Sequence, residues 1–214
     1  MNYEFNLWNN YRNQDLKYLF LDTETTGFNP IDDCIIQLSF ILVNNNFECD
    51  INEIEDYIIS ITDNSIIRNS NIHGITNEIC KNKGILIIDA LKNFYNKLIQ
   101  CTHIVAYNAK FDLTFIKVAL VNINTEEAFL ILSELNSKII LDPMIELRHI
   151  VIKNGKYNMG ICYENIVGNE IEKAHNSKYD VYNLVEIIKV FYLNFHKYEE
   201  NSPNNFINHG CNYL

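Results

Sequence analysis

The first third of the chain consists of short apolar runs that end in polar turn residues. Four apolar residues at 18–21 are followed by Asp22 and Glu24 and then by a glycine. A second run, 34–43, is rich in β-branched residues. Runs of this length and composition, bounded by turn signals, predict buried strands rather than helices.

Three asparagines at 44–46 predict a turn after the second run. We expect residues 47–50 to return from this turn as a third strand and so to complete a hairpin. The stretch 54–61 is compatible with a further strand or with a short helix. Thr76 is placed to cap a short helix over 77–80.

Later segments carry apolar residues at intervals of three and four, which predicts amphipathic helices. Strands that come first, followed by helices alternating with single strands, indicate an α/β fold in which a central mixed β-sheet is flanked by α-helices. The two later strands are expected at 103–108 and 139–143. The predicted helices span 88–99, 109–120, 126–135, 144–152, 157–167 and, most clearly, 180–195.

The two ends of the chain fall outside this pattern. Residues 1–16 are rich in asparagine and predict an N-terminal arm, and 196–214 predict a polar C-terminal tail. A single domain over 17–195 accounts for the rest, which is an ordinary size for one domain.

The chain is acidic, with a formal net charge of -10 and a pI of about 5.0. This balance argues against a protein that holds long duplex nucleic acid by neutralising phosphates, because such proteins carry a basic face. It does not exclude an enzyme that grips a few nucleotides through metal ions, whose acidic ligands would supply part of the negative charge.

The sequence predicts an intracellular protein, cytoplasmic or nuclear, that is not secreted. Residues 1–17 lack the apolar core of a signal peptide, and no apolar run has the length of a membrane helix. None of the six cysteines forms a C-x-x-C pair, and reduced thiols are typical of intracellular proteins.

Asp22 and Glu24 are the first candidates for chemistry. Side chains alternate along a strand, so these two carboxylates point the same way while Thr23 points the other way. Two carboxylates on one face of a buried strand repel each other unless a cation lies between them. Mg²⁺ or Mn²⁺ is the natural partner for such oxygen ligands. The alternative is an acidic strand end that merges into a solvated turn.

Two further carboxylates lie at junctions of predicted elements. Asp112 falls in the first turns of its helix, and Asp180 opens the last helix, with His175 five residues before it. Taken singly, each carboxylate has an ordinary explanation, since acidic residues at helix N-termini complement the helix dipole. Their conjunction with the acidic pair of the first strand favours a shared site.

Three stretches resemble the motifs of DnaQ-like (DEDDh) 3′→5′ exonucleases. The first is 22–27 (Asp-Thr-Glu-Thr-Thr-Gly), the second 108–112 (Asn-Ala-Lys-Phe-Asp) and the third 175–180 (His-Asn-Ser-Lys-Tyr-Asp). The stretch 72–76 (Ile-His-Gly-Ile-Thr) also has a counterpart in that family, between the first two motifs. The resemblance covers residues 17–195 and implies a ribonuclease H-like fold.

The third motif selects the subclass. Members of the tyrosine type carry Tyr four positions before the last aspartate, where this chain has Asn176. Members of the histidine type carry His five positions before it, where this chain has His175. The motif departs from the family pattern at Ser177, Val181 and Tyr182, where small residues are common, but the ligand positions are intact.

The resemblance implies hydrolysis with two metal ions. Asp22, Glu24, Asp112 and Asp180 would hold two Mg²⁺ or Mn²⁺ ions about 3.5–4 Å apart. By resemblance, one ion presents the attacking water, and the other, bridged through Asp22, neutralises the leaving 3′ oxygen. Asp112 is expected to act largely through metal-bound water. His175 takes the proton from the attacking water, a task that suits an imidazole.

The resemblance also implies substrate contacts around the metals. The Thr-Thr-Gly turn can place backbone N–H and hydroxyl groups against the terminal nucleotide, and aromatic rings can stack on exposed bases. The phenylalanines of this set could equally belong to the core, and its histidine could merely stabilise its own loop. The candidate substrate-binding residues are Thr23, Thr25, Thr26, Gly27, Phe28, His73, Asn108 and Phe111.

We therefore predict a metal-dependent 3′→5′ exonuclease that acts on single-stranded or frayed 3′ ends and releases nucleoside 5′-monophosphates. Thr23 resembles the DNA-proofreading members more than those that degrade short RNA, so DNA is favoured over RNA, in proofreading or repair. The alternatives are a 3′→5′ exoribonuclease and a non-catalytic module that docks to a polymerase. A DNA polymerase is a candidate partner of the enzyme as well.

Overall fold

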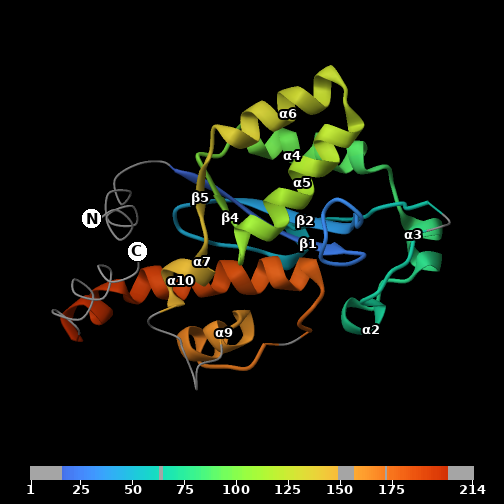
Figure 1. The fold of residues 1–214 in the computed structure, drawn as a ribbon. Helices are drawn as coiled ribbons and strands as arrows, with labels where there is room; N and C mark the ends of the chain where they lie inside the picture. The colour runs from blue at the N-terminus through green and yellow to red at the C-terminus, as the bar shows by residue number, and fades with distance from the viewer. Residues whose placement is uncertain (1–15, 63–64, 149–156, 172, 202–214) are drawn as a thin grey trace, which may run out of the picture.

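The computed structural model describes residues 16–62, 65–148, 157–171 and 173–201 (Figure 1). Its strands are β1 (Lys17–Thr25), β2 (Ile35–Asn44), β3 (Glu55–Ile58), β4 (His103–Val105) and β5 (Ile139–Leu141). They form a five-stranded sheet in the order β3-β2-β1-β4-β5. β2 pairs antiparallel with β1 and with β3, whereas β4 pairs parallel with β1 and with β5. The sheet is therefore mixed, as the sequence predicts.

Helices cover both faces of the sheet (Figure 1). One face carries α4 (Ile87–Leu98), α5 (Ala109–Ile123) and α6 (Glu126–Asn136). The other face carries the long α10 (Ser177–Asn201), with α9 (Met159–Val167) beside it. The short elements are η1 (Ile51–Glu53), α2 (Ser70–His73), α3 (Asn77–Lys83) and α7 (Pro143–Glu146).

The alternation of side chains along β1 divides the core into two layers. Leu19 and Leu21 share a buried cluster with Phe94 of α4. Tyr18 and Phe20 point to the opposite face, into the cluster beneath α10. Because the period of a strand is two, positions 22 and 24 continue the α10 face. The core thus decides which face of the sheet receives the acidic pair.

The prediction of a third strand at 47–50 is wrong. Phe47 leaves the turn after β2 with a φ of 51°, and its buried ring lies 5.0 Å from the ring of Tyr18 and 6.2 Å from that of Phe20, between centroids. The left-handed backbone at this residue directs the chain into the core instead of along the edge of β2. β3 takes the place beside β2, so the ambiguous stretch 54–61 contains a strand.

Two predicted helix ends are confirmed in detail. The hydroxyl of Thr76 accepts from the backbone N–H of Ile79 and caps α3, as its position in the sequence indicates. α9 ends at Gly168, whose backbone is left-handed with a φ of 91°. Both ends follow from local side-chain chemistry.

Other segment boundaries differ from the predictions or lie beyond the described residues. The helix predicted over 144–152 is described only as the single turn α7, because 149–156 lie outside the described residues. α10 runs to Asn201, past its predicted end at 195. The predicted arm before Leu16 and the tail after Asn201 also lie outside them.

Among the described residues, no helix is both long enough and apolar enough to cross a bilayer. The five cysteines within those residues are free thiols: Cys34, Cys49, Cys80, Cys101 and Cys162. Cys211 lies outside the described residues, and the cellular location stays a prediction from sequence.

Phe94 is the position that tests the core between the sheet and α4. Its side chain is fully buried, and its ring meets that of Phe40 edge-on at 5.4 Å. We expect Phe94→Ala to lower the free energy of unfolding by about 3–5 kcal/mol, because it leaves a cavity. The measurement is urea denaturation followed by circular dichroism. Phe129→Ala, on the outer side of α6 where the ring is 48% exposed, should cost about 1 kcal/mol or less. Equal losses of unfolding free energy in the two variants would contradict this description of the core.

Candidate active site

The carboxylates of β1 lie at the end of that strand, on the face covered by α10. Oxygen atoms of Asp22, Glu24 and Asp180 all lie within 4.8 Å of one another. Thr23, between the two acidic residues of β1, reaches α5 on the opposite face. The predicted common face of Asp22 and Glu24 is therefore confirmed, and a carboxylate from the other end of the chain joins them.

Buried polar residues of β2 continue this acidic end of the sheet. Ser39 lies opposite Asp22 in the antiparallel register, and Gln37 lies opposite Glu24. Both β2 side chains are buried, and the Ser39 hydroxyl lies 2.5 Å from the hydroxyl of Ser177, the first residue of α10. This hydrogen bond joins β2 to the first turn of α10, which carries the third carboxylate. The departure from the family pattern at Ser177 thus has a structural use.

Asp180 lies in that first turn and is almost fully buried. Its backbone N–H donates to the carbonyl of Asn176 at 2.9 Å. Its Oδ1 is buried and has no hydrogen-bond partner among the described residues. A buried carboxylate oxygen without a donor is unfavourable unless a cation supplies the missing contact.

Asp112 reaches the same place from the other face of the sheet, on the first turn of α5. Its Oδ1 accepts from the backbone N–H and the hydroxyl of Thr23, at 2.9 and 2.6 Å. Asp142, directly after β5, accepts from the backbone N–H groups of Asn108 and Ala109, at 3.0 and 2.9 Å. These contacts fix the start of α5 between β1 and β5 and hold Asp112 beside the acidic end of β1.

These groups open into one cavity of about 340 Å³. β1 and α5 supply its acidic wall, and the start of α9 and the segment before α10 supply the opposite side. His175 lines the cavity from an exposed position, with a left-handed φ of 65°. The lining residues are Asp22, Thr23, Glu24, Tyr107, Phe111, Asp112, Asn158, Met159, Gly160, Ile171, Ala174, His175 and Asp180.

Burial raises the pKa of all four carboxylates, and repulsion within the cluster adds to the shift at Asp22 and Glu24. Burial, and then the charges of Asp112, Asp180 and Glu24, raise the pKa of Asp22 well above its usual value. Burial, and then Asp180 and Asp112, raise the pKa of Glu24 to about 8. Burial also raises the pKa values of Asp112 and Asp180, despite hydrogen bonds that favour their charged forms. Without a cation, this cluster therefore retains protons near neutral pH.

The same residues fit a divalent metal ion. Clustered carboxylate oxygens are the ligands that Mg²⁺ and Mn²⁺ prefer. A cation among them would remove the repulsion, restore the charged forms and contact the unpartnered oxygen of Asp180. A single bound cation would therefore offset the repulsion, the loss of the charged forms and the missing contact of the Asp180 oxygen.

The hydroxyls of the turn after β1 are engaged within the turn itself. Thr25 Oγ1 donates to the carbonyl of Gly27 at 2.6 Å, and Thr26 Oγ1 donates to Oδ1 of Asp33 at 3.1 Å. Thr25, Thr26 and Gly27 are not among the residues that line the cavity. Internal hydrogen bonds, rather than open hydroxyl groups, therefore organise this turn.

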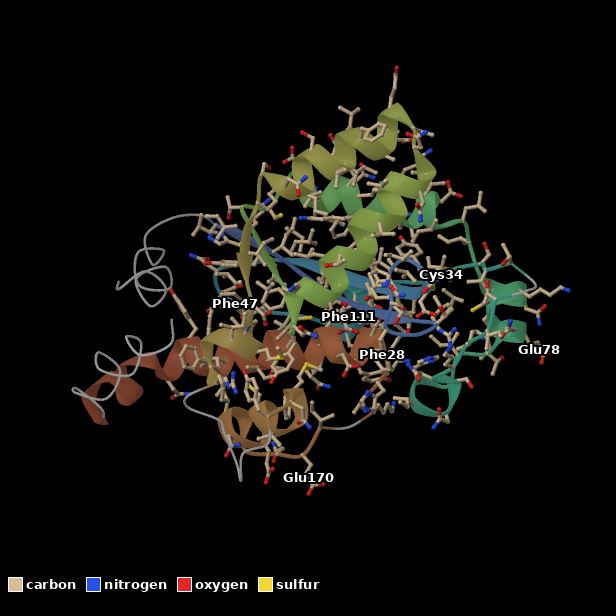
Figure 2. All side chains as sticks on the ribbon, in the orientation of Figure 1. Phe28, Cys34, Phe47, Glu78, Phe111 and Glu170 are labelled. Carbon is tan, nitrogen blue, oxygen red and sulfur yellow. The ribbon has the colours of Figure 1, made fainter. Side chains whose placement is uncertain are left out.

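Phe28 and Phe111 lie side by side (Figure 2). Their ring centroids are 6.4 Å apart, and Phe111 also packs on Phe115 at 4.9 Å. Phe111 lines the cavity. Phe28 is 75% exposed, so the interpretation as a core residue is wrong for this phenylalanine.

His73 ends α2 outside the cavity lining, and its ring is buried. Burial, and then the charge of nearby His175, lower the pKa of His73. Its Nδ1 accepts from the backbone N–H of Ile75 at 3.1 Å, which places the proton of the neutral ring on Nε2. That Nε2 has no hydrogen-bond partner among the described residues. His73 therefore stabilises its loop and also keeps a spare donor near His175.

Asn108 is exposed and lies outside the cavity lining. Its φ of 66° makes the sharp turn from β4 into α5, and its side chain makes no capping hydrogen bond. Asparagine tolerates this backbone region better than most residues, so the turn itself explains the residue type.

Sequence reasoning missed part of the cavity wall and one anchor. Asn158 carries a visible signal, since it precedes an apolar run and its Oδ1 accepts from the backbone N–H of Ile161 at 2.9 Å. That signal predicts the start of α9, but nothing in it places this start over the acidic cluster. Asp142 follows an apolar run in the sequence as Asp22 does and could have been suspected on that ground. The missed lining residues are Tyr107, Asn158, Met159, Gly160, Ile171 and Ala174.

Comparison with known families gives one match that covers most of the chain. The family model RNase_T, described as exonuclease, matches residues 19–188. A comparison with curated proteins found no match.

Several solved structures of exonuclease I are similar in fold. Escherichia coli exonuclease I with single-stranded DNA and zinc has a TM-score of 0.68 at 20% identity, over 87% of this chain and 42% of that chain. The same enzyme with a 5cy-dT13 oligonucleotide has a TM-score of 0.69 at 20% identity, over 91% and 45%. Exonuclease I from Methylocaldum szegediense has a TM-score of 0.66 at 18% identity, over 90% and 42%.

This chain spans less than half the length of those exonuclease I chains. At this level of identity, the similarity establishes the fold. The ribonuclease H-like architecture expected from the sequence is confirmed.

The raised pKa values predict how pH and metal act on stability. A proton that the folded protein holds up to about pH 8 at Glu24 is lost from the unfolded chain near 4.5, so the folded state binds more protons between these limits. In EDTA, the melting temperature should therefore fall as the pH rises from 5 to 8. Millimolar Mg²⁺ should raise it more at pH 8 than at pH 5.

Glu24→Gln is the matched variant for this measurement, because it keeps the shape of the side chain and removes its titration. It should flatten the fall in EDTA, as seen by differential scanning calorimetry. Identical pH slopes for the parent and for Glu24→Gln would contradict the repulsion described here.

Proposed function

This chain belongs to the exonuclease family, and on that premise we propose that it is a metal-dependent 3′→5′ exonuclease. It would act on single-stranded or frayed 3′ ends and release nucleoside 5′-monophosphates. The observation that carries the proposal is the convergence of four carboxylates and one histidine, from three distant parts of the chain, on one cavity.

The metal site of this proposal consists of Asp22, Glu24, Asp112 and Asp180. Two ions, Mg²⁺ or Mn²⁺, are expected there, in line with the four acidic ligands. When bound, such ions act as Lewis acids that make a water molecule more nucleophilic and neutralise charge on the phosphodiester and its leaving oxygen. Thr23 supports this set, because its two donors hold Asp112 in position.

His175 is the proposed general base. Its exposed position on the cavity wall lets it take a proton from the attacking water and pass that proton to solvent. As the water oxygen bonds to the terminal phosphorus, the bond from that phosphorus to the 3′ oxygen of the preceding nucleotide breaks. The leaving 3′ oxygen takes up a proton from solvent, so the products are a nucleoside 5′-monophosphate and a chain one nucleotide shorter with a new 3′ hydroxyl.

Substrate contacts are proposed around this centre. The exposed ring of Phe28 and the neighbouring ring of Phe111 are suited to stack on the terminal bases of a single strand. His73 stays a candidate contact: its Nε2–H has no partner among the described residues, but it is buried and would have to be uncovered to donate to a phosphate oxygen. Thr25, Thr26 and Gly27 would approach the nucleotide through their backbone, because the hydroxyls of the two threonines are already hydrogen-bonded. Asn108 remains a candidate contact at the start of α5.

DNA is the proposed substrate, in proofreading or repair. Exonuclease I, whose fold this chain shares, is described in complexes with single-stranded DNA and with oligonucleotides. The Thr23 resemblance to DNA-proofreading members points the same way. A polymerase partner stays a prediction, since neither the family match nor the matched structures name one.

Loss of a metal ligand or of the base should abolish or strongly reduce cleavage. With a 5′-labelled single-stranded oligonucleotide and Mg²⁺, the parent should produce a ladder that shortens from the 3′ end. Asp22→Asn should remove activity, and His175→Ala should lower kcat by about 10²- to 10⁴-fold. Asp89→Asn, an exposed carboxylate on α4, is the control and should keep full activity. Equal rates in all four proteins would contradict the assignment.

The sugar preference can be measured with DNA and RNA oligonucleotides of one sequence. We expect a higher kcat/KM for DNA; with a sequence that contains neither thymine nor uracil, the 2′-hydroxyl is the only difference between the substrates. A higher value for RNA would make this protein an exoribonuclease. Cleavage of neither substrate, together with tight binding to a polymerase, would instead favour the docking module.

A further inference from the structure

Phe28 occupies an unusual position for a large apolar side chain. It is 75% exposed, yet the loop that carries it, residues 26–33, is held by a dense set of hydrogen bonds. An exposed aromatic ring on a fixed loop gains nothing for stability from its exposure. Figure 2 shows Phe28 next to Phe111, and Phe111 lines the cavity.

The side chain of Asp33 is the centre of this loop. Its Oδ1 accepts from the Thr26 hydroxyl at 3.1 Å, and its Oδ2 accepts from the backbone N–H of Asn29 at 3.0 Å. These two donors flank Phe28 on either side in the sequence. The carboxylate therefore ties together the residues before and after Phe28.

Asp33 also packs directly against Gly27. A Cβ atom at Gly27 would lie 2.4 Å from Oδ2 of Asp33, which is closer than Cβ atoms come to other atoms in folded proteins. The glycine of the first motif is thus required by the carboxylate beneath it. A side chain at position 27 would push Asp33 away and release the loop.

Arg68 completes the arrangement from the segment before α2. Its Nη1 donates to Oδ1 of Asp33 at 2.5 Å, and its backbone N–H donates to the carbonyl of Thr26 at 3.0 Å. The Asp33 side chain is 4% exposed and that of Arg68 is 57% exposed. Burial alone would raise the pKa of Asp33, but the hydrogen bonds from Asn29, Thr26 and Arg68 lower it. Asp33 therefore remains charged and available as an acceptor at neutral pH.

We propose that Asp33, together with Arg68, is a positioning residue for substrate binding: it fixes the loop so that the Phe28 ring stands beside Phe111 and stacks on the 3′-terminal base. A pre-organised ring binds a base without first losing conformational freedom, which improves affinity rather than the chemical step. This inference rests on the proposed exonuclease function and deepens it.

The test compares oligonucleotides with a normal 3′-terminal nucleotide and with an abasic one. For the normal substrate, Phe28→Ala should raise KM about tenfold, within the range of a lost base–aromatic stack, with kcat almost unchanged. Asp33→Asn should raise KM for the same substrate by a similar factor. Neither substitution should change KM for the abasic substrate, because no terminal base is present to stack.

Asp32→Asn is the matched control, since Asp32 lies in the same loop and, among the described residues, accepts from the side-chain amide of Asn29 alone. It should leave both substrates unaffected. Arg68→Gln alters the exposed member of the pair and so reports on the same contact with little risk to folding. It should raise KM for the normal substrate by a smaller factor than Asp33→Asn. The double variant Phe28→Ala/Asp33→Asn should lose no more affinity than Phe28→Ala alone.

Two results would overturn the proposal while leaving the exonuclease function intact. One is an unchanged KM in folded Asp33→Asn and Arg68→Gln proteins. The other is an equal loss on normal and abasic substrates, which would mean that Asp33 only stabilises the end of β1. If the parent itself cleaves no 3′ end, the proposed function fails, and this inference fails with it.

Discussion

Repulsion among buried carboxylates is the constraint on which the rest of this structure depends. Asp22, Glu24, Asp112 and Asp180 are driven together by elements that fold for other reasons. Burial raises the pKa of each, and the charges of the cluster raise those of Asp22 and Glu24 further. Such a cluster does not stabilise a protein core, since each carboxylate has a lower free energy in water. A divalent cation among the oxygens would offset this repulsion.

The fold meets this constraint by holding the ligands from independent directions. Alternation along β1 places Asp22 and Glu24 on the α10 face, while Thr23 reaches through to Asp112 on α5. A hydrogen bond between β2 and the first residue of α10 secures the third motif. One helix or strand could not supply four converging carboxylates. The sheet therefore holds the starts of α5 and α10, which carry two of them, beside the end of β1. The position of the Phe28 ring beside Phe111 is fixed separately, by the loop around Asp33.

Much of this could be predicted from sequence, because the strongest signals are local. The strand that ends in Asp22 and Glu24, the capping by Thr76 and the end of α9 at Gly168 depend on residues within one turn or strand. The spacing of the three motifs supplied the carboxylates and the histidine. These predictions needed no knowledge of what packs against what.

The failures concern tertiary contacts. The sequence predicts that Phe47 begins a third strand, but its ring packs against Tyr18 and Phe20 in the core. The substrate role expected for Thr23 gave no hint that both its donors serve Asp112, which lies 89 residues away. Asp33 and Arg68 belong to none of the three motifs. Their hydrogen bonds to the loop 26–33 become visible only in the folded structure.

The number of protons released on metal binding is the most direct test of whether a cation binds among these carboxylates. Titration calorimetry with Mn²⁺ at pH 7, in buffers of different ionisation enthalpy, measures the protons that leave the protein as the ion binds. The account predicts binding with a net release of about one proton or more, and a smaller release for Glu24→Gln. Binding with the same enthalpy in every buffer, or no binding at all, would contradict it.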